Sequence, residues 1–158
     1  MNLLKLAVSL LVCLGAGWIG SIFTTPSIPT WYAGLAKPSF NPPNGVFGPV
    51  WTLLYLLMGI ALFLVWRKAP QAPGAGLALV LFLVQLALNV LWSILFFGLR
   101  SPLLGLVDIL LLWAAILATM LLFFRVSPAA GALLVPYLLW VSFASVLNFA
   151  IWRLNLLR

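Results

Sequence analysis

The sequence contains no histidine, one cysteine and one acidic residue among its 158 residues. Without histidine, Ser-His-Asp and Cys-His catalysis are excluded, and the commonest protein ligand of metals and haem iron is missing. The single cysteine, Cys13, allows no intramolecular disulfide and no cysteine cluster for zinc or iron-sulfur groups. The single acid, Asp108, cannot support a mechanism that needs two carboxylates. We therefore expect no metal site and no conventional catalytic site.

Charged residues make up only 6% of the chain, whereas hydrophobic residues make up 66%. A soluble domain is closer to half apolar and about a quarter charged. Five apolar runs reach the roughly 20 residues that a helix needs to cross about 30 Å of hydrocarbon. They cover residues 3–23, 46–66, 74–99, 103–124 and 129–152. The sequence thus predicts one all-α domain, an integral membrane bundle of five transmembrane helices in contact with the lipid bilayer.

The eight basic residues give a net charge of +7, which in a soluble protein would suggest a nucleic-acid partner. Here all except Lys37 lie near the ends of the apolar runs, where cations anchor helices to lipid headgroups. We therefore expect no nucleic-acid partner. Five spans place four basic residues at each membrane surface, so the positive-inside rule decides neither the orientation nor the membrane.

The first apolar run is compatible with a cleaved signal peptide or a retained span. Its apolar residues continue to a stop at residues 24–26, which favours a retained span. Small residues in this run let another helix approach closely, either within one bundle or in a dimer, and we favour the bundle. They form the pairs Ala16/Gly20 and Gly17/Ser21.

The first loop, residues 24–45, is far longer than the two to eight residues that usually join helices, and such loops are usually functional or disordered. Its aromatic residues and five prolines argue against disorder. The aromatic surface continues into the second run, where Trp51 and Tyr55 are four residues apart and share a helical face. We expect a structured loop that closes a pocket between the helices.

Polar residues of the third run fall on one face, because Gln85, Asn89 and Ser93 follow at intervals of four, with Trp92 beside them. Amides in hydrocarbon usually turn inward and find partners. Hydrogen bonds between helices and contacts with a ligand are both compatible with this pattern.

The fifth run offers an opposing face, on which Trp140, Ala144 and Asn148 lie together and the small Ala144 leaves space beside the indole. Pro136 frees a backbone carbonyl there, which a bundle tolerates where a neighbour or a cavity satisfies it.

Asp108 lies within the fourth run, and an ionisable residue inside a span is a candidate for function. It is near the Arg100 end of that run, so an ion pair with Arg100, Arg153 or Lys37 is an equally good interpretation.

One series of motifs follows the whole chain in order. It comprises Trp31-Tyr32, Lys37-Pro38, Phe40, Asn41-Pro42-Pro43, Val46-Phe47, Trp51-Thr52, Tyr55, residues 85–93, residues 96–98, Val107-Asp108, residues 136–140, Ala144 and residues 147–149. Together these motifs resemble the TspO/translocator protein family, the tryptophan-rich sensory proteins once called peripheral benzodiazepine receptors.

The resemblance implies a five-helix bundle, commonly a homodimer, with a pocket under the first loop. In the family this pocket takes porphyrins, haem-like tetrapyrroles, sterols and isoquinoline or benzodiazepine ligands, so a tetrapyrrole would be a ligand and not a cofactor. Matching positions imply that Tyr32, Trp51, Asn89, Trp140 and Ala144 line it. If light-dependent porphyrin breakdown occurs, the resemblance assigns it to Trp51 and Trp140, and no other catalytic residue is expected.

The residues and the resemblance together predict a set of ligand-binding residues. The set is Tyr32, Trp51, Tyr55, Gln85, Asn89, Trp92, Trp140, Ala144 and Asn148. The sterol-recognition pattern of animal members needs a tyrosine where this chain has Phe149 between Leu147 and Arg153, which favours planar tetrapyrroles over sterols.

Three functions of different classes follow. The first is a membrane receptor for porphyrin-type ligands, and the second is photochemical porphyrin degradation. The third is transport of a tetrapyrrole or sterol, which ranks last because the chain has no internal repeat and only one acid for ion coupling.

Overall fold

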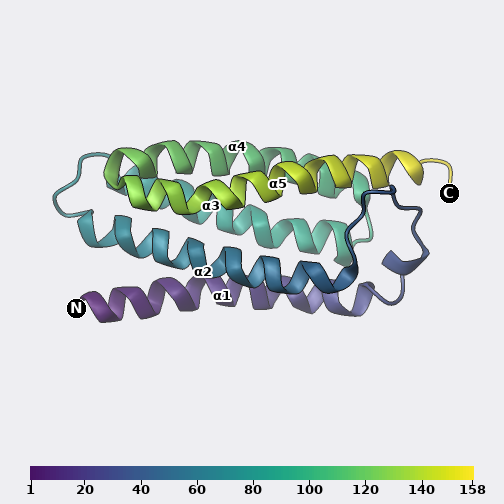
Figure 1. The fold of residues 1–158 in the computed structure, drawn as a ribbon, viewed down its shortest axis with the longest axis horizontal. Coiled ribbons are helices and arrows are strands. Elements are labelled where there is room, and N and C mark those ends of the chain that lie inside the picture. Colours follow the sequence, from purple (N-terminus) through teal and green to yellow (C-terminus); the bar gives the residue numbers. More distant parts are fainter.

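The computed structural model describes residues 1–158 and contains five long helices that run side by side (Figure 1). They are α1 (Asn2–Ser27), α2 (Asn44–Lys68), α3 (Ala75–Ser93), α4 (Pro102–Val126) and α5 (Pro128–Leu154). A π-helical turn, Ile94–Gly98, extends α3. All five helices are long and apolar enough to cross a membrane, so the prediction of an all-α, multi-pass integral membrane protein is confirmed.

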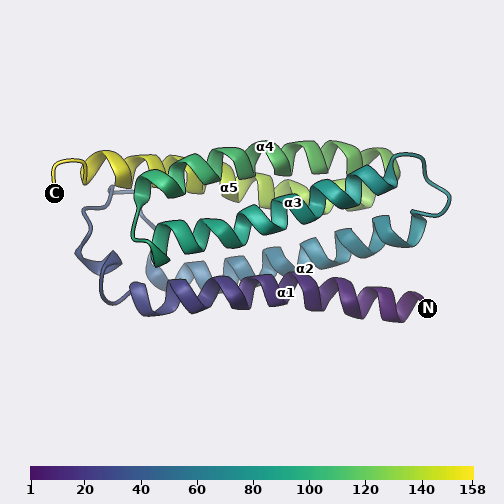
Figure 2. The ribbon, with the colours of Figure 1, turned by 180° about the vertical axis from the view of Figure 1, so that it is seen from behind.

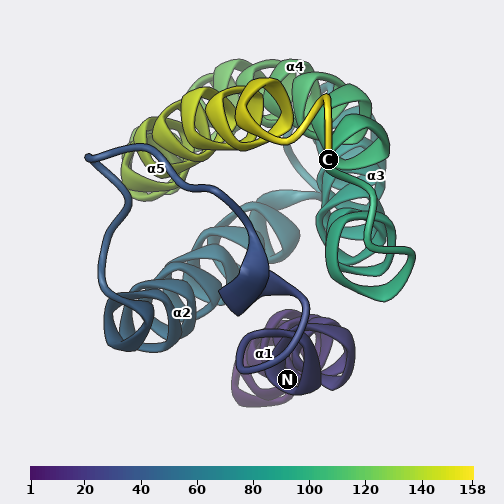
Figure 3. The same cartoon turned by 90° about the vertical axis from the view of Figure 1, so that its right-hand side faces the viewer.

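The helices form a ring when the bundle is viewed from the end that carries the C-terminus (Figure 3). Around the ring the order is α1, α2, α5, α4 and α3, and the neighbours in this order are in contact. Seen from behind, α3 and α4 lie in front of α5, while α1 and α2 lie below them (Figure 2). The segment between α1 and α2 crosses over the open end of the ring.

This segment, residues 28–43, is called the lid below. The lid is shorter than the predicted loop because α1 continues to Ser27, so the predicted stop at residues 24–26 is wrong. Pro26 lies in the last turn of α1, where it removes one backbone donor but leaves the next turn intact. The N–H of Ile28 still donates to the carbonyl of Thr24 at 3.2 Å, across the proline.

The boundaries of α4 and α5 have local causes. Ser101 and Ser127 are N-caps, and each side-chain oxygen accepts a hydrogen bond from the backbone N–H three residues later, at 3.2 and 3.4 Å. Pro102 and Pro128 follow in the first turn, where a missing N–H costs nothing. The caps and the prolines together fix where these two helices begin.

The small residues of α1 pack inside the bundle, as the sequence favoured. Ala16 and Gly20 are buried. A Cβ atom added at Gly20 would lie 3.0 Å from Oγ of Ser93 on α3, and one added at Gly17 would lie 2.6 Å from the ring of Tyr55 on α2. The glycines therefore let α1 approach both of its neighbours.

Candidate ligand-binding site

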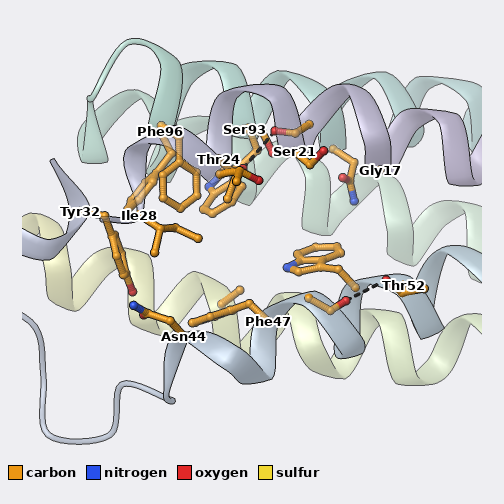
Figure 4. A pocket seen from close by; sticks show the side chains of 18 of the residues that line it. Gly17, Ser21, Thr24, Ile28, Tyr32, Asn44, Phe47, Thr52, Ser93 and Phe96 are labelled. Atoms are coloured by element: carbon orange, nitrogen blue, oxygen red, sulfur yellow. Dashed lines mark hydrogen bonds between the residues drawn. The ribbon is translucent and has the colours of Figure 1, made fainter. Parts of the chain in front are cut away.

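A cavity of about 520 Å³ lies beneath the lid. Its walls come from α1, α2, the α3 segment with its π-helical turn, and α5, whereas α4 contributes no lining residue. Figure 4 shows side chains from these elements pointing into the same space. Cavities of this size that are mostly apolar, with a few polar groups, are typical of small-molecule sites.

Aromatic rings form much of the cavity wall. On α2, Trp51 and Tyr55 are neighbours with ring centroids 5.7 Å apart. On α3, Trp92 stacks on Phe96 at 5.0 Å and an interplanar angle of 19°. From α5, Trp140 completes the wall and meets an aromatic ring of α2 edge-on at 6.0 Å. Faces of this kind bind flat conjugated ligands by stacking.

Tyr32 forms the roof of the cavity. Its side chain is only 4% exposed and packs on the rings of Phe96 and Phe97, with centroids 6.5 and 5.7 Å away. Its hydroxyl donates to Oδ1 of Asn41 at 3.1 Å, and the ammonium of Lys37 lies 4.6 Å from the ring centroid. Burial raises the pKa of Tyr32, outweighing the opposite effect of the Asn41 hydrogen bond, so the hydroxyl is neutral.

A chain of buried hydrogen bonds joins three helices at the floor of the cavity, where Tyr55 and Asn89 line it, and continues below the floor. The hydroxyl of Tyr55 on α2 donates to Oδ1 of Asn89 on α3 at 2.6 Å. Nδ2 of Asn89 donates to the hydroxyl of Tyr137 on α5 at 2.7 Å. That hydroxyl in turn donates to Oε1 of Gln85 at 2.7 Å. Each hydroxyl and amide has a definite direction here, so the chain fixes the three helices against each other.

A second polar connection links α3, α5 and the start of α4. Nε1 of Trp92 donates to Oδ1 of Asn148 at 3.0 Å, and Nδ2 of Asn148 donates to the carbonyl of Pro102 at 2.8 Å. By contrast, Nε1 of Trp140 is buried without a partner. Leaving a buried donor unpaired costs free energy.

The cavity opens sideways between α1 and α2. Lining residues on the two facing edges are exposed, among them Trp18 (68% exposed) and Ser21 on α1 and Thr52 on α2. Figure 4 shows open space between Ser21 and Thr52. Both helices are long and apolar enough to cross a membrane, so this opening lies between two membrane-spanning helices.

Comparison with known proteins gives the family. The TspO/MBR family pattern matches residues 9–153. The chain belongs to the TspO/MBR family. It is 52% identical to the tryptophan-rich protein TspO of Archaeoglobus fulgidus over 155 residues. These residues cover 98% of this chain and 99% of that protein.

Two further relatives of this TspO/MBR family member cover somewhat less of the chain. The translocator protein of Homo sapiens is 45% identical over 139 residues, or 87% of this chain and 82% of that protein. The tryptophan-rich sensory protein of Cereibacter sphaeroides is 43% identical over 125 residues, which cover 79% of this chain and 77% of that protein. The family resemblance seen in the motifs is thus confirmed.

Eight of the nine predicted ligand-binding residues line the cavity of this TspO/MBR family member. They are Tyr32, Trp51, Tyr55, Asn89, Trp92, Trp140, Ala144 and Asn148. Gln85 does not line the cavity, because its side chain lies below the floor. There its Oε1 accepts a hydrogen bond from the hydroxyl of Tyr137, and its Nε2 lies 3.9 Å from the sulfur of Met58. In the structure both Gln85 and Asn89 make interhelical hydrogen bonds.

Asp108 lies outside the cavity in this TspO/MBR family member. It is 3% exposed, and neither carboxylate oxygen has a hydrogen-bond or ionic partner. The interpretation as an ion pair is therefore wrong. Arg100 and Arg153 are exposed at the bundle surface, and Nζ of Lys37 donates instead to lid carbonyls at 3.2 and 3.5 Å.

Two residues that organise the site were not among the predicted site residues. Tyr137 lies just below the floor, between Asn89 and Gln85 in the hydrogen-bond chain, and its signal was a tyrosine inside a span, a residue whose hydroxyl usually finds a partner when buried. Ser27 donates to the carbonyl of Phe97 in the π-helical turn at 3.0 Å, which no sequence pattern indicated because the two residues are 70 positions apart.

Proposed function

We propose that this TspO/MBR family member is a membrane receptor for porphyrin-type tetrapyrroles. The observation that carries the proposal is the convergence of Trp51, Trp92 and Trp140, from three helices, on one cavity. Indole faces stack well on a flat conjugated ring, and a cavity of about 520 Å³ accepts much of such a ring.

The sideways opening between α1 and α2 supports the same proposal. A tetrapyrrole is largely apolar and partitions into the bilayer, so it reaches the exposed edge at Trp18 and Thr52 by diffusion within the membrane.

A titration tests the proposal directly. Protoporphyrin IX is added to the protein in lipid nanodiscs, and tryptophan fluorescence is recorded. We expect saturable quenching in the micromolar range and absorption changes in the porphyrin with the same midpoint. The control is a mixture of empty nanodiscs and free tryptophan. Quenching that rises linearly, does not saturate and equals the quenching in this control would contradict the proposal.

The second candidate function is light-dependent breakdown of the bound porphyrin. Trp51 and Trp140 both line the cavity, so an excited porphyrin stacked there contacts oxidisable indoles. The chain's only acid lies outside the cavity, which leaves the photochemistry to the ligand itself.

Other parts of the proposal rest on the family alone. Sterols and isoquinoline-type compounds are secondary ligands, and transport of a tetrapyrrole is a third candidate function, in line with the name translocator protein borne by the human relative. A homodimer is the proposed assembly, and native mass spectrometry of the protein released from nanodiscs measures it.

A further inference from the structure

The side chain of Asn155 joins the lid to the C-terminal end of α5. Its Oδ1 accepts a hydrogen bond from the backbone N–H of Ala36 at 3.1 Å, and its Nδ2 donates to the carbonyl of the same residue at 2.9 Å. The two residues are 119 positions apart. Nδ2 also donates to the carbonyl of Ile151 at 2.7 Å, which fixes the carboxamide on the last turn of α5.

These two bonds are the lid's only hydrogen bonds to α3, α4, α5 or the residues after α5. The lid's other hydrogen bonds stay within residues 28–43 or join it to the adjoining ends of α1 and α2. Apart from Asn155, contact between the lid and the bundle is mostly aromatic packing, which tolerates sliding more readily than a paired carboxamide does.

Asn155 fixes the part of the lid that covers the cavity. Tyr32 lies between two fixed points, the bond of Ser27 to the π-helical turn on one side and the Asn155 pair at Ala36 on the other. The rest of the lid is held less firmly, since Phe40 is 47% exposed and has one edge-on contact, with Phe143 at 6.3 Å. Loss of the Asn155 pair would leave Tyr32 tied on one side only.

We propose that Asn155 is a positioning residue that keeps the lid closed over the cavity and thereby sets how fast a bound flat ligand leaves. The identity of the ligand in this inference rests on the proposed function. The hold of Asn155 on the lid rests on its two hydrogen bonds with Ala36. The inference concerns dissociation more than association, because a lid that opens takes Tyr32 away from the bound ligand and raises the free energy of the bound state, whereas the free state makes no such contact.

Two measurements on the full chain in nanodiscs test it. Hydrogen exchange of peptides covering residues 32–41 reports lid opening without any ligand, and stopped-flow displacement of protoporphyrin IX gives its dissociation rate. For Asn155→Ala we expect both rates to rise about tenfold, which corresponds to about 1.4 kcal/mol. Asn155→Asp keeps an acceptor for the Ala36 N–H, so its rates should be intermediate.

Two further variants separate the lid contact from the capping of α5. Ala36→Pro removes the backbone N–H that donates to Oδ1 of Asn155. It leaves the hydrogen bond from Nδ2 of Asn155 to the carbonyl of Ile151. The preceding Leu35 already has φ −74° and ψ 146°, a conformation that suits a residue before proline. We expect faster dissociation here too. Leu156→Ala, at an exposed neighbour of Asn155, is the control and should behave as wild type.

The outcomes are distinct. Binding by the wild type together with an unchanged dissociation rate in Asn155→Ala overturns the inference and leaves the proposed function intact. Unchanged exchange of residues 32–41 in that variant also overturns it. A wild type that binds no porphyrin overturns the proposed function instead, and faster exchange in Asn155→Ala would then still support the lid contact.

Discussion

The hydroxyl of Tyr55 on α2 and the amide oxygen of Asn89 on α3 are 2.6 Å apart, and both side chains are buried at the floor of the cavity. Because Tyr55 donates, Asn89 must present its oxygen to α2 and its nitrogen to Tyr137 on α5. A single amide thus holds three helices at the depth where the ligand would rest.

Removing hydroxyl groups from the floor should destabilise the bundle in a graded way. Tyr55→Phe leaves one buried oxygen, on Asn89, without its donor, whereas Tyr137→Phe removes a group that both accepts and donates. We expect a loss of about 0.5–2 kcal/mol for Tyr55→Phe and a larger loss for Tyr137→Phe. Unfolding of the protein in mixed micelles measures both. A smaller loss of stability for Tyr137→Phe than for Tyr55→Phe would contradict the central place of Tyr137 in this chain of hydrogen bonds.

Gly17 and Gly15 provide a matched pair on α1. A Cβ atom at Gly17 would lie 2.6 Å from the ring of Tyr55, whereas one at Gly15 would meet nothing within 4 Å. Gly17→Ala should therefore cost about 1–3 kcal/mol through overpacking and should weaken porphyrin binding by displacing Tyr55. Gly15→Ala should be neutral or stabilising by up to about 1 kcal/mol, since alanine favours helix. Equal unfolding midpoints for the two variants would contradict the close contact.

Filling the cavity should abolish binding without unfolding the protein. Ala144 lines the cavity beside Trp140, so Ala144→Phe places a ring where the ligand would stack. We expect at least tenfold weaker binding of protoporphyrin IX in the fluorescence titration. Val146→Phe on the same helix is the control, because Val146 is 58% exposed and does not line the cavity. Normal binding by Ala144→Phe would place the ligand elsewhere.

Substitution of the cavity tryptophans distinguishes receptor from photochemical enzyme. In Trp51→Phe and Trp140→Phe the wall remains aromatic, so binding should weaken only several-fold while the rate of porphyrin loss under illumination falls further. Trp66→Phe is the control, because Trp66 lies in the last turn of α2 and does not line the cavity. An unchanged rate in both cavity variants would dismiss the photochemical function and leave the receptor intact.

Neutralising Asp108 should stabilise the protein. Asp108→Asn keeps the shape of a buried side chain whose oxygens have no partner and removes its capacity for charge. We expect a gain of about 1 kcal/mol or more in unfolding free energy, because an unpaired buried charge is costly. Porphyrin affinity should not change, since Asp108 does not line the cavity. Destabilisation would mean that the carboxylate makes an interaction that the amide cannot replace.

The sequence predicted the helices well, because hydrophobic length alone decides which segments can cross a membrane. The prediction was less accurate at the ends of the helices. Pro26 looked like a stop, yet a proline in the last turn costs only one hydrogen bond. The π-helical turn after Ser93, which contacts both α1 and α4, had no signal in the sequence.

The candidate site was predicted mostly from helical spacing together with the family resemblance. Spacing shows which side chains share a face but not how deep each one lies, and for this reason Gln85 falls below the floor while Asn89 lines the cavity. Asn155 escaped prediction for a different reason. Its partner is a backbone group at Ala36, and a backbone group carries no mark in the sequence.

The lid and the C-terminus lie at the same end of the bundle, and the N-terminus lies at the other (Figure 1). A purification tag or fluorescent fusion joined after Arg158 would begin only three residues from Asn155 and could pull on the lid that it is meant to report on. The same fusion joined before Met1 would sit across the membrane from the lid. Measurements of ligand release are therefore best made on protein handled by its N-terminus.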